Sequence, residues 1–233
     1  MKLYSFFRSG TSHRLRIALN LKGLPYRTET VDLRSERHLD AAYRSIHPQG
    51  LVPALQLEAS DGEGGERVLI QSPAIIEWLE ERFPAPALLP RDPAQRAHVR
   101  ALAAIVGCDI HPVNNRRILE ALRREHGADD AAVNRWCATW IAAGFDALEA
   151  LLAADRQRGD FCFGGAPTLA DVYLVPQVES ARRFGVDVGR WPAIQAVDAA
   201  CAGLAAFHDA APRAQPESGV AAAPVTPARS PLP

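Results

Sequence analysis

The sequence predicts an α/β domain followed by an all-helical domain, and three observations support this fold class. Short apolar runs alternate with helical patterns over the first 83 residues. A proline-rich stretch, FPAPALLPR, then interrupts the periodicity at residues 83–91. Beyond it, apolar residues recur only at helical spacing. We therefore expect an α/β domain at residues 1–83, a linker at 84–91, a helical domain at 92–212 and a disordered tail, rich in Pro, Ala and Ser, at 213–233.

The first domain shows strand and helix signals in the order β-α-β-α-β-β-α, which is typical of a mixed sheet with helices packed on it. Strands are predicted at residues 2–6, 27–33, 51–57 and 67–70, and helices at 12–22, 36–46 and 73–83. Gly23 is expected just past the end of the first helix, and Ser72 and Pro73 at the start of the third, as N-cap and first residue. Pro53 belongs at a strand start or turn, because proline cannot donate to a ladder. The sequence DGEGGE at residues 61–66 predicts a flexible hairpin tip.

The helical domain is expected to begin with one long helix over residues 93–124, bent or broken at Pro112. A second helix is predicted at 130–154, with a core stripe made of Trp136, Trp140, Phe145, Leu148 and Leu152. Thr168 and Asp171 have capping-box spacing before a buried helix, and a last amphipathic helix is predicted at 194–210.

The amino-acid composition indicates which classes of binding partner and which cellular compartment to expect. The formal net charge of −1 provides no basic excess, which argues against nucleic acid or an acidic membrane surface as the main partner. An anionic ligand would therefore need a local arginine cluster. The four cysteines are widely spaced, without metal-ligand spacing, and are expected to be buried, reduced thiols. We find no signal-peptide pattern and expect no membrane span, so a cytoplasmic protein is expected.

The segment Ser9-Gly10-Thr11-Ser12-His13-Arg14 closes an apolar run and opens a helical one. It places hydroxyl groups and backbone N–H groups at the first turn of a helix, where an anion or a thiolate is stabilised. A second interpretation is that Thr11 or Ser12 serves only as the helix N-cap.

The two-domain order, the proline-rich linker and the Thr168-Leu-Ala-Asp171 box together resemble the glutathione transferase superfamily over residues 1–212. The segments FRSGTSHRLRIAL (7–19), LVP (51–53), QSPAIIE (71–77) and LVPQV (174–178) are similar to the zeta class. Where that class usually has Ser-Ser-Cys, this chain has Ser9-Gly10-Thr11. The form SGTSHR, with CDIHP (108–112) and NNRR (114–117), resembles the bacterial maleylpyruvate isomerases of this class.

This resemblance implies a thioredoxin-like N-terminal domain that binds glutathione and an all-helical C-terminal domain that binds the substrate. It implies a cis Val52–Pro53 bond that turns the Val52 backbone toward the cysteinyl residue of glutathione. Gln71 and Ser72 would bind the γ-glutamyl carboxylate of glutathione. His38 and Gln49 would bind its glycyl end. The implied glutathione-binding residues are Ser9, Gly10, Thr11, His38, Gln49, Val52, Gln71, Ser72, Asp109, Ile110, His111, Asn115, Arg116 and Arg117. Residues 109–111 would contact glutathione of the same subunit or of the other subunit across a homodimer interface. From the residues alone, Ser72 is equally a helix cap, His38 a solvated helix residue and His111 a core or surface residue.

The resemblance also implies the chemistry. Ser9 or Thr11 would donate to the glutathione thiolate, with Arg8 beside the turn. Arg8, Arg117 and Arg183 would bind the carboxylates of a small diacid, because a guanidinium group binds a carboxylate through two hydrogen bonds. The implied reaction is glutathione-dependent cis–trans isomerisation of maleylpyruvate to fumarylpyruvate in aromatic catabolism, by reversible thiolate addition to the double bond. The alternatives are maleylacetoacetate isomerisation in tyrosine and phenylalanine breakdown, a glutathione-conjugating transferase, and a non-enzymatic adaptor with the same fold.

Overall fold

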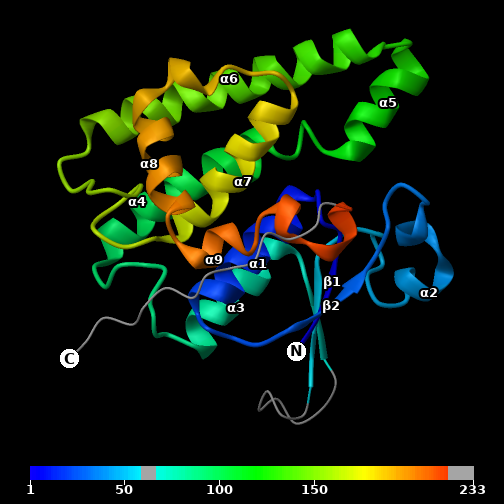
Figure 1. Ribbon diagram of the computed structural model, residues 1–233, viewed down its shortest axis with the longest axis horizontal. Coiled ribbons are helices and arrows are strands. Elements are labelled where there is room, and N and C mark those ends of the chain that lie inside the picture. The colour runs from blue at the N-terminus through cyan, green and yellow to red at the C-terminus, as the bar shows by residue number, and fades with distance from the viewer. Residues whose placement is uncertain (59–66, 220–233) are drawn as a thin grey trace.

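The computed structural model describes residues 1–58 and 67–219 (Figure 1). The hairpin tip expected at 61–66 and residues 220–233 of the expected tail lie outside the described residues. The α/β domain contains strands β1 (Lys2–Ser5), β2 (Arg27–Thr30), β3 (Ala54–Leu57) and β4 (Arg67–Ile70), and helices α1 (Gly10–Leu21), α2 (Ala41–Arg44) and α3 (Ser72–Arg82).

The four strands form one mixed sheet in the order β2-β1-β3-β4. β1 pairs with β2 in parallel, with Leu3 opposite Thr28, and with β3 antiparallel, with Leu3 opposite Leu55. β4 then pairs antiparallel with β3. The predicted mixed sheet with helices on it is therefore confirmed.

The helical domain contains α4 (Pro93–Ala104), α5 (Arg116–His126), α6 (Asp130–Ala154), α7 (Leu169–Arg183), α8 (Pro192–Ala202) and α9 (Ala205–His208). α1 packs against both α3 and α7, so it joins the two domains. One buried cluster runs without interruption from Leu3 and Leu15 to Ile141 and Ile194. A second cluster, which includes Tyr4, Tyr43 and Val52, covers the other face of the sheet.

Several element predictions need correction. The helix expected at 36–46 is a short 3₁₀ turn followed by the four-residue α2, because Glu36 is left-handed (φ 59°) and Asp40 is extended (ψ 143°). The last helix is divided into α8 and α9. The long helix expected at 93–124 ends at Ala104 and continues as a π-helix (Ile105–Ile110), a turn that contains Pro112, and α5.

Other differences concern single residues. The N-cap of α1 is Ser9, and that of α3 is Gln71 rather than Ser72. Trp140 is 39% exposed and so lies outside the buried stripe of α6. Cys108 is exposed, while the other three cysteines are buried and free. Residues 213–219 are not disordered: they form two short 3₁₀ turns, and Gln215 is buried there.

By length and composition α6 could cross a membrane, contrary to our expectation that no segment would pass this test. Its apolar side, which includes Val133, Ile141 and Phe145, is buried in the protein core instead. α6 packs against α8 and the π-helix. These contacts are those of a long core helix.

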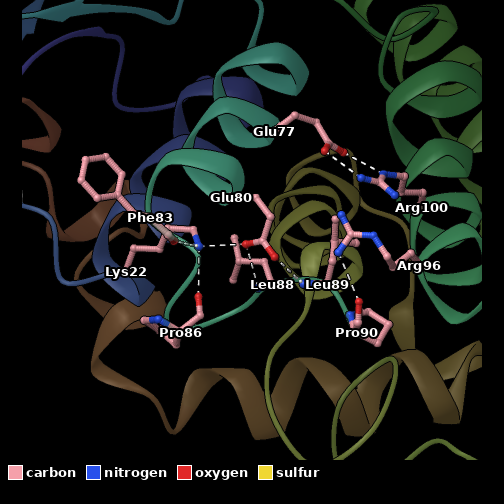
Figure 2. A network of polar contacts seen from close by, with 10 residues as sticks. All are labelled: Lys22, Glu77, Glu80, Phe83, Pro86, Leu88, Leu89, Pro90, Arg96 and Arg100. Atoms are coloured by element: carbon pink, nitrogen blue, oxygen red, sulfur yellow. Dashed lines mark hydrogen bonds and ion pairs between the residues drawn. The ribbon is translucent and has the colours of Figure 1, made fainter. Parts of the chain in front are cut away.

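The stretch 84–91 is non-helical, as predicted. Its residues 84–87 are exposed, Leu88 and Leu89 are buried, and polar contacts hold the stretch to the α/β domain (Figure 2). Lys22, the C-cap of α1, donates to Glu80 Oε2 at 2.8 Å and to the carbonyls of Phe83 and Pro86 at 2.7 and 3.0 Å. The Glu80 carboxylate accepts in turn from the backbone N–H groups of Leu88 and Leu89. A buried ion pair therefore fixes the course of this segment.

Candidate active site

The turn between β1 and α1 places two hydroxyl groups at the start of α1. Ser9 caps this helix: its Oγ accepts from the backbone N–H of Ser12 at 3.2 Å. The Thr11 hydroxyl donates to the carbonyl of Val52 at 2.8 Å, and the Ser9 and Thr11 oxygens lie 2.8 Å apart. Because the single Thr11 proton is directed at Val52, Ser9 is the donor between the two hydroxyls. Ser9 can therefore turn its proton toward a ligand while the link from Thr11 to Val52 stays in place.

The turn opens onto a cavity of about 580 Å³ between the domains, which we call the large cavity. α5 and the end of α7 form its opposite wall. Its cations come from several elements, namely Arg8, Arg34, Arg116, Arg117, Arg123 and Arg183, while Glu120 is the carboxylate among the lining residues. The large cavity therefore suits an anionic ligand.

Arg8 and Arg183 lie together at this cavity. Arg183 Nη1 donates to the carbonyl of Arg8 at 3.3 Å, and Nη2 donates to Ser180 Oγ at 3.1 Å. Desolvation, followed by repulsion from Arg8, lowers the pKa of Arg183. Its neighbour Arg182 instead pairs with Asp198 of α8 at 2.6 Å. At the end of α7, Arg183 thus lines the cavity, whereas Arg182 forms an ion pair with α8.

A smaller cavity of about 160 Å³ adjoins the large one, and we call it the small cavity. Thr11, Val52, His111, Asn115 and Arg117 line both cavities, so they mark the boundary between them. Gln49, Gln71 and Ser72 line the small cavity, whereas Ser9, Gly10, His38 and Arg116 line the large one. The Val52–Pro53 bond is cis.

The small cavity contains buried polar atoms that have no hydrogen-bond partner. They are Arg14 Nε, His47 Nδ1 and Ser72 Oγ, and all three residues line it. Ser72 begins α3, whose N-terminus favours a negative charge. Gln71 precedes it with a positive φ of 68°, which is uncommon for a residue other than glycine. Such donors fit an amino-acid carboxylate, as a bound γ-glutamyl group would present.

His111 lies between the two cavities, and a Cβ added at Gly10 would lie 3.8 Å from its Nδ1. Burial, followed by repulsion from Arg14, Arg183 and Arg117, lowers its pKa to about 3. The imidazole is therefore neutral at physiological pH, so it carries one N–H donor and one acceptor nitrogen.

Most of the predicted site residues come together at these two cavities, but two do not line either one. Ile110 is fully buried and faces Gly144 of α6, so its side chain belongs to the core. Asp109 is exposed at the end of the π-helix. Sequence reasoning missed Arg14, Arg34, His47 and Arg123. Arg14 follows Thr11 by three residues in the same helix, a spacing that could have indicated a shared face.

Comparison with known proteins assigns the family. Residues 8–82 match the model described as "Glutathione S-transferase, N-terminal domain", and residues 130–213 match the corresponding C-terminal domain. This chain belongs to the glutathione S-transferase family. It is 66% identical to a maleylpyruvate isomerase of Ralstonia sp, over 94% of this chain and 100% of that protein. It is also 48% identical to a maleylacetoacetate isomerase of Pseudomonas aeruginosa, over 95% and 100% of the two chains.

Solved structures agree with this assignment to the glutathione S-transferases. The holo structure of a bacterial zeta-class maleylpyruvate isomerase has a TM-score of 0.90 and 66% identity, covering 94% of this chain and 100% of that one. A maleylacetoacetate isomerase from Anaeromyxobacter dehalogenans, with bound GSH in its active site, has a TM-score of 0.83 and 44% identity, covering 93% and 97%. The glutathione transferase fold implied by the sequence is confirmed.

Proposed function

We propose that this member of the glutathione S-transferase family isomerises maleylpyruvate to fumarylpyruvate, with glutathione as cofactor. The observation that carries the proposal is the arginine-lined large cavity, which meets the hydroxyl-bearing turn of α1 on one side and the small cavity on the other. A substrate with a carboxylate at each end matches such a cavity. The identity of 66% to a maleylpyruvate isomerase supports the choice of this substrate.

When bound, glutathione supplies a thiolate that adds reversibly to the cis double bond, which permits rotation about it. Ser9 would hold the sulfur through its hydroxyl, since its proton can turn from Thr11 without breaking the bond from Thr11 to Val52. A thiol with a pKa of about 8.5 is about 3% ionised at pH 7, so complete ionisation raises the reactive fraction about thirtyfold at most. Orientation and charge stabilisation must supply the rest of the rate enhancement.

The arginines supply that orientation. Arg8 and Arg183 would hold one carboxylate of the substrate, because Arg183 donates to the Arg8 carbonyl and both residues line the large cavity beside the turn. Arg117, on α5 and at the boundary of both cavities, would hold the other or the glycyl end of glutathione. The neutral His111 adds a donor that does not depend on pH near neutrality.

The remaining glutathione contacts follow from the small cavity. The Val52 backbone would pair with the cysteinyl residue, and Gln71 and Ser72 would bind the γ-glutamyl carboxylate at the start of α3. Gln49, which lines the small cavity, and His38, which lines the large one, would bind the glycyl end of glutathione. We also propose a homodimer, a cytoplasmic location and a place in aromatic catabolism, as the resemblance implies.

The test is an assay of the purified protein with glutathione and either maleylpyruvate or maleylacetoacetate. We expect conversion of both, a higher kcat/KM for maleylpyruvate, and no conversion without glutathione. A higher kcat/KM for maleylacetoacetate would overturn the substrate assignment. Failure to convert either acid would overturn the isomerase function.

A further inference from the structure

Arg14 is a buried cation without a counter-charge among the described residues. It lies on α1, is 2% exposed, and forms no ion pair with a carboxylate of residues 1–58 or 67–219. Its guanidinium group stacks over the Tyr173 ring, with 4.1 Å between Cζ and the ring centroid, and its Nε has no hydrogen-bond partner. Burying a charge without pairing costs several kcal/mol, so such a group calls for a partner.

Two other buried cations, Arg16 on α1 and Lys22 at its C-terminal end, have structural roles and provide a comparison. Arg16 donates from Nε to the Ala210 carbonyl at 2.8 Å, from Nη1 to Ser5 Oγ and from Nη2 to the Phe7 carbonyl, both at 3.1 Å. Lys22 pairs with Glu80. Protein groups satisfy both of these cations, whereas Arg14 retains an unused donor.

That donor belongs to a residue of the small cavity. Arg14 lines it together with Ser72 and His47, whose Oγ and Nδ1 are also buried and without partners. The cavity therefore combines a positive charge, a hydroxyl donor and the N-terminus of α3, all of which favour a carboxylate. Arg14 does not line the large cavity and Ser9 does not line the small one, which separates Arg14 from the position proposed for the sulfur.

We propose that Arg14 is the charge partner of the γ-glutamyl α-carboxylate of glutathione and determines which thiols the enzyme accepts. This inference rests on the proposed use of glutathione. Thiols without that carboxylate, such as cysteinylglycine, would leave the Arg14 charge buried and unpaired, and are rejected for this reason. The effect resembles other sites in which an unpaired buried polar group excludes the wrong ligand.

The test uses Arg14→Met, which keeps a long apolar side chain against Tyr173, and Arg14→Lys, which keeps the charge. Calorimetry would measure the binding of glutathione, of glutathione amidated at its glycyl carboxylate, and of 4-aminobutanoyl-cysteinylglycine, which lacks only the γ-glutamyl α-carboxylate. We expect Arg14→Met to weaken binding of the first two by about tenfold or more and to leave binding of the third unchanged. Arg14→Lys should recover part of the loss.

Equal weakening of all three ligands, or of none, would overturn the proposal. Thermal unfolding without glutathione provides a second readout. Arg14→Met should be at least as stable as the wild type there, since an unpaired buried charge has been removed, and should gain less from added glutathione. A strongly destabilised or unfolded Arg14→Met protein would show a structural role instead. Failure of the wild type to bind glutathione would overturn the proposed function. That result differs from one in which the wild type and Arg14→Met bind glutathione equally well, which would overturn only the role of Arg14.

Discussion

Ser9 and Thr11 carry the two hydroxyls that could donate to the glutathione sulfur in the proposed function. Thr11 is engaged with the Val52 carbonyl at 2.8 Å, while the Ser9 oxygen accepts from the Ser12 N–H and its proton is directed at Thr11. Turning the Ser9 proton therefore disturbs less of the structure than turning that of Thr11. We infer that Ser9 is the donor to the thiolate and that Thr11 positions the Val52 backbone.

This assignment predicts different results for two substitutions. Ser9→Ala should lower kcat/KM about tenfold and raise the pKa of the bound thiol toward about 8.5, because the thiolate loses its donor. It should also cost about 1 kcal/mol of stability through the lost helix cap. Thr11→Val should lower kcat/KM less and leave that pKa nearly unchanged. Ultraviolet titration of the bound thiolate measures both, and the reverse order would assign the donor to Thr11.

Arg182 and Arg183 offer a matched pair for testing the diacid site. Arg183→Ala should raise the KM for maleylpyruvate by about tenfold or more and change the KM for glutathione little, because a charged hydrogen bond to the substrate is lost. Arg182→Ala removes the same charge from the adjacent position but breaks only the pair with Asp198. Steady-state kinetics should show no comparable rise in KM for this control. Equal effects on both KM values in Arg183→Ala would exclude a role in diacid binding.

At the scale of elements, two ion pairs at the domain junction differ in burial (Figure 2). The side chains of Lys22 and Glu80 are 0% and 8% exposed, whereas those of Arg100 and Glu77 are 40% and 35% exposed. Glu80 also accepts from the N–H groups of Leu88 and Leu89, so it fixes the segment between the domains.

Glu80→Ala should therefore lower the free energy of unfolding by about 3–5 kcal/mol, because Lys22 would remain buried and unpaired. Glu77→Ala removes a carboxylate from the same helix and should cost less than about 1 kcal/mol, since its pair is exposed to solvent. Urea unfolding measures both values. Similar losses in the two variants would contradict the dominant role of the buried pair.

Local signals were enough to place some elements but not others. α6 begins after Asp129, whose carboxylate accepts from the Ala132 N–H at 2.7 Å, and both of its ends agree with the prediction. The capping box of α7 is formed as predicted, with Asp171 accepting from Thr168 N at 2.7 Å. Where the chain itself contains the capping group, sequence is sufficient.

The break between α4 and α5 depends on contacts that are distant in sequence. A Cβ at Gly107 would lie 2.8 Å from Tyr173 of α7, and one at Gly144 would collide with Ile110. These close approaches accompany the π-helix, and periodicity within residues 93–124 contains no sign of them. The same limit applies to the site: residue types and motifs predicted Arg8, Arg117 and Arg183, but only the fold shows that Arg14 and His47 face the small cavity.

At the scale of the whole molecule, the buried cluster is continuous across both domains, so unfolding should be cooperative. Histidines with lowered pKa values make this stability depend on pH. The pKa of His13 is lowered by burial and then by Arg16 and Arg14, and that of His111 is lowered to about 3. Below an ordinary histidine pKa of about 6.5, the unfolded chain therefore binds more protons than the folded one.

Stability should consequently fall as the pH decreases from about 6.5 to about 5, by up to about 1.4 kcal/mol per pH unit for each such histidine. His111→Asn should reduce the slope of unfolding free energy against pH by the contribution of one histidine, up to about 1.4 kcal/mol per pH unit. Urea unfolding at several pH values measures the slope in both proteins. A free energy of unfolding that stays constant, or rises, as the pH decreases over this interval would contradict the neutral state of these histidines in the folded protein.

The central claim is that glutathione acts here as a recycled cofactor on a diacid held by arginines. The most direct measurement gives the enzyme one glutathione molecule for about every hundred maleylpyruvate molecules, and follows the fumaryl product by NMR together with the free thiol. The account predicts complete conversion with the free thiol unchanged. Conversion that stops after one equivalent of glutathione, with loss of the thiol, would contradict it.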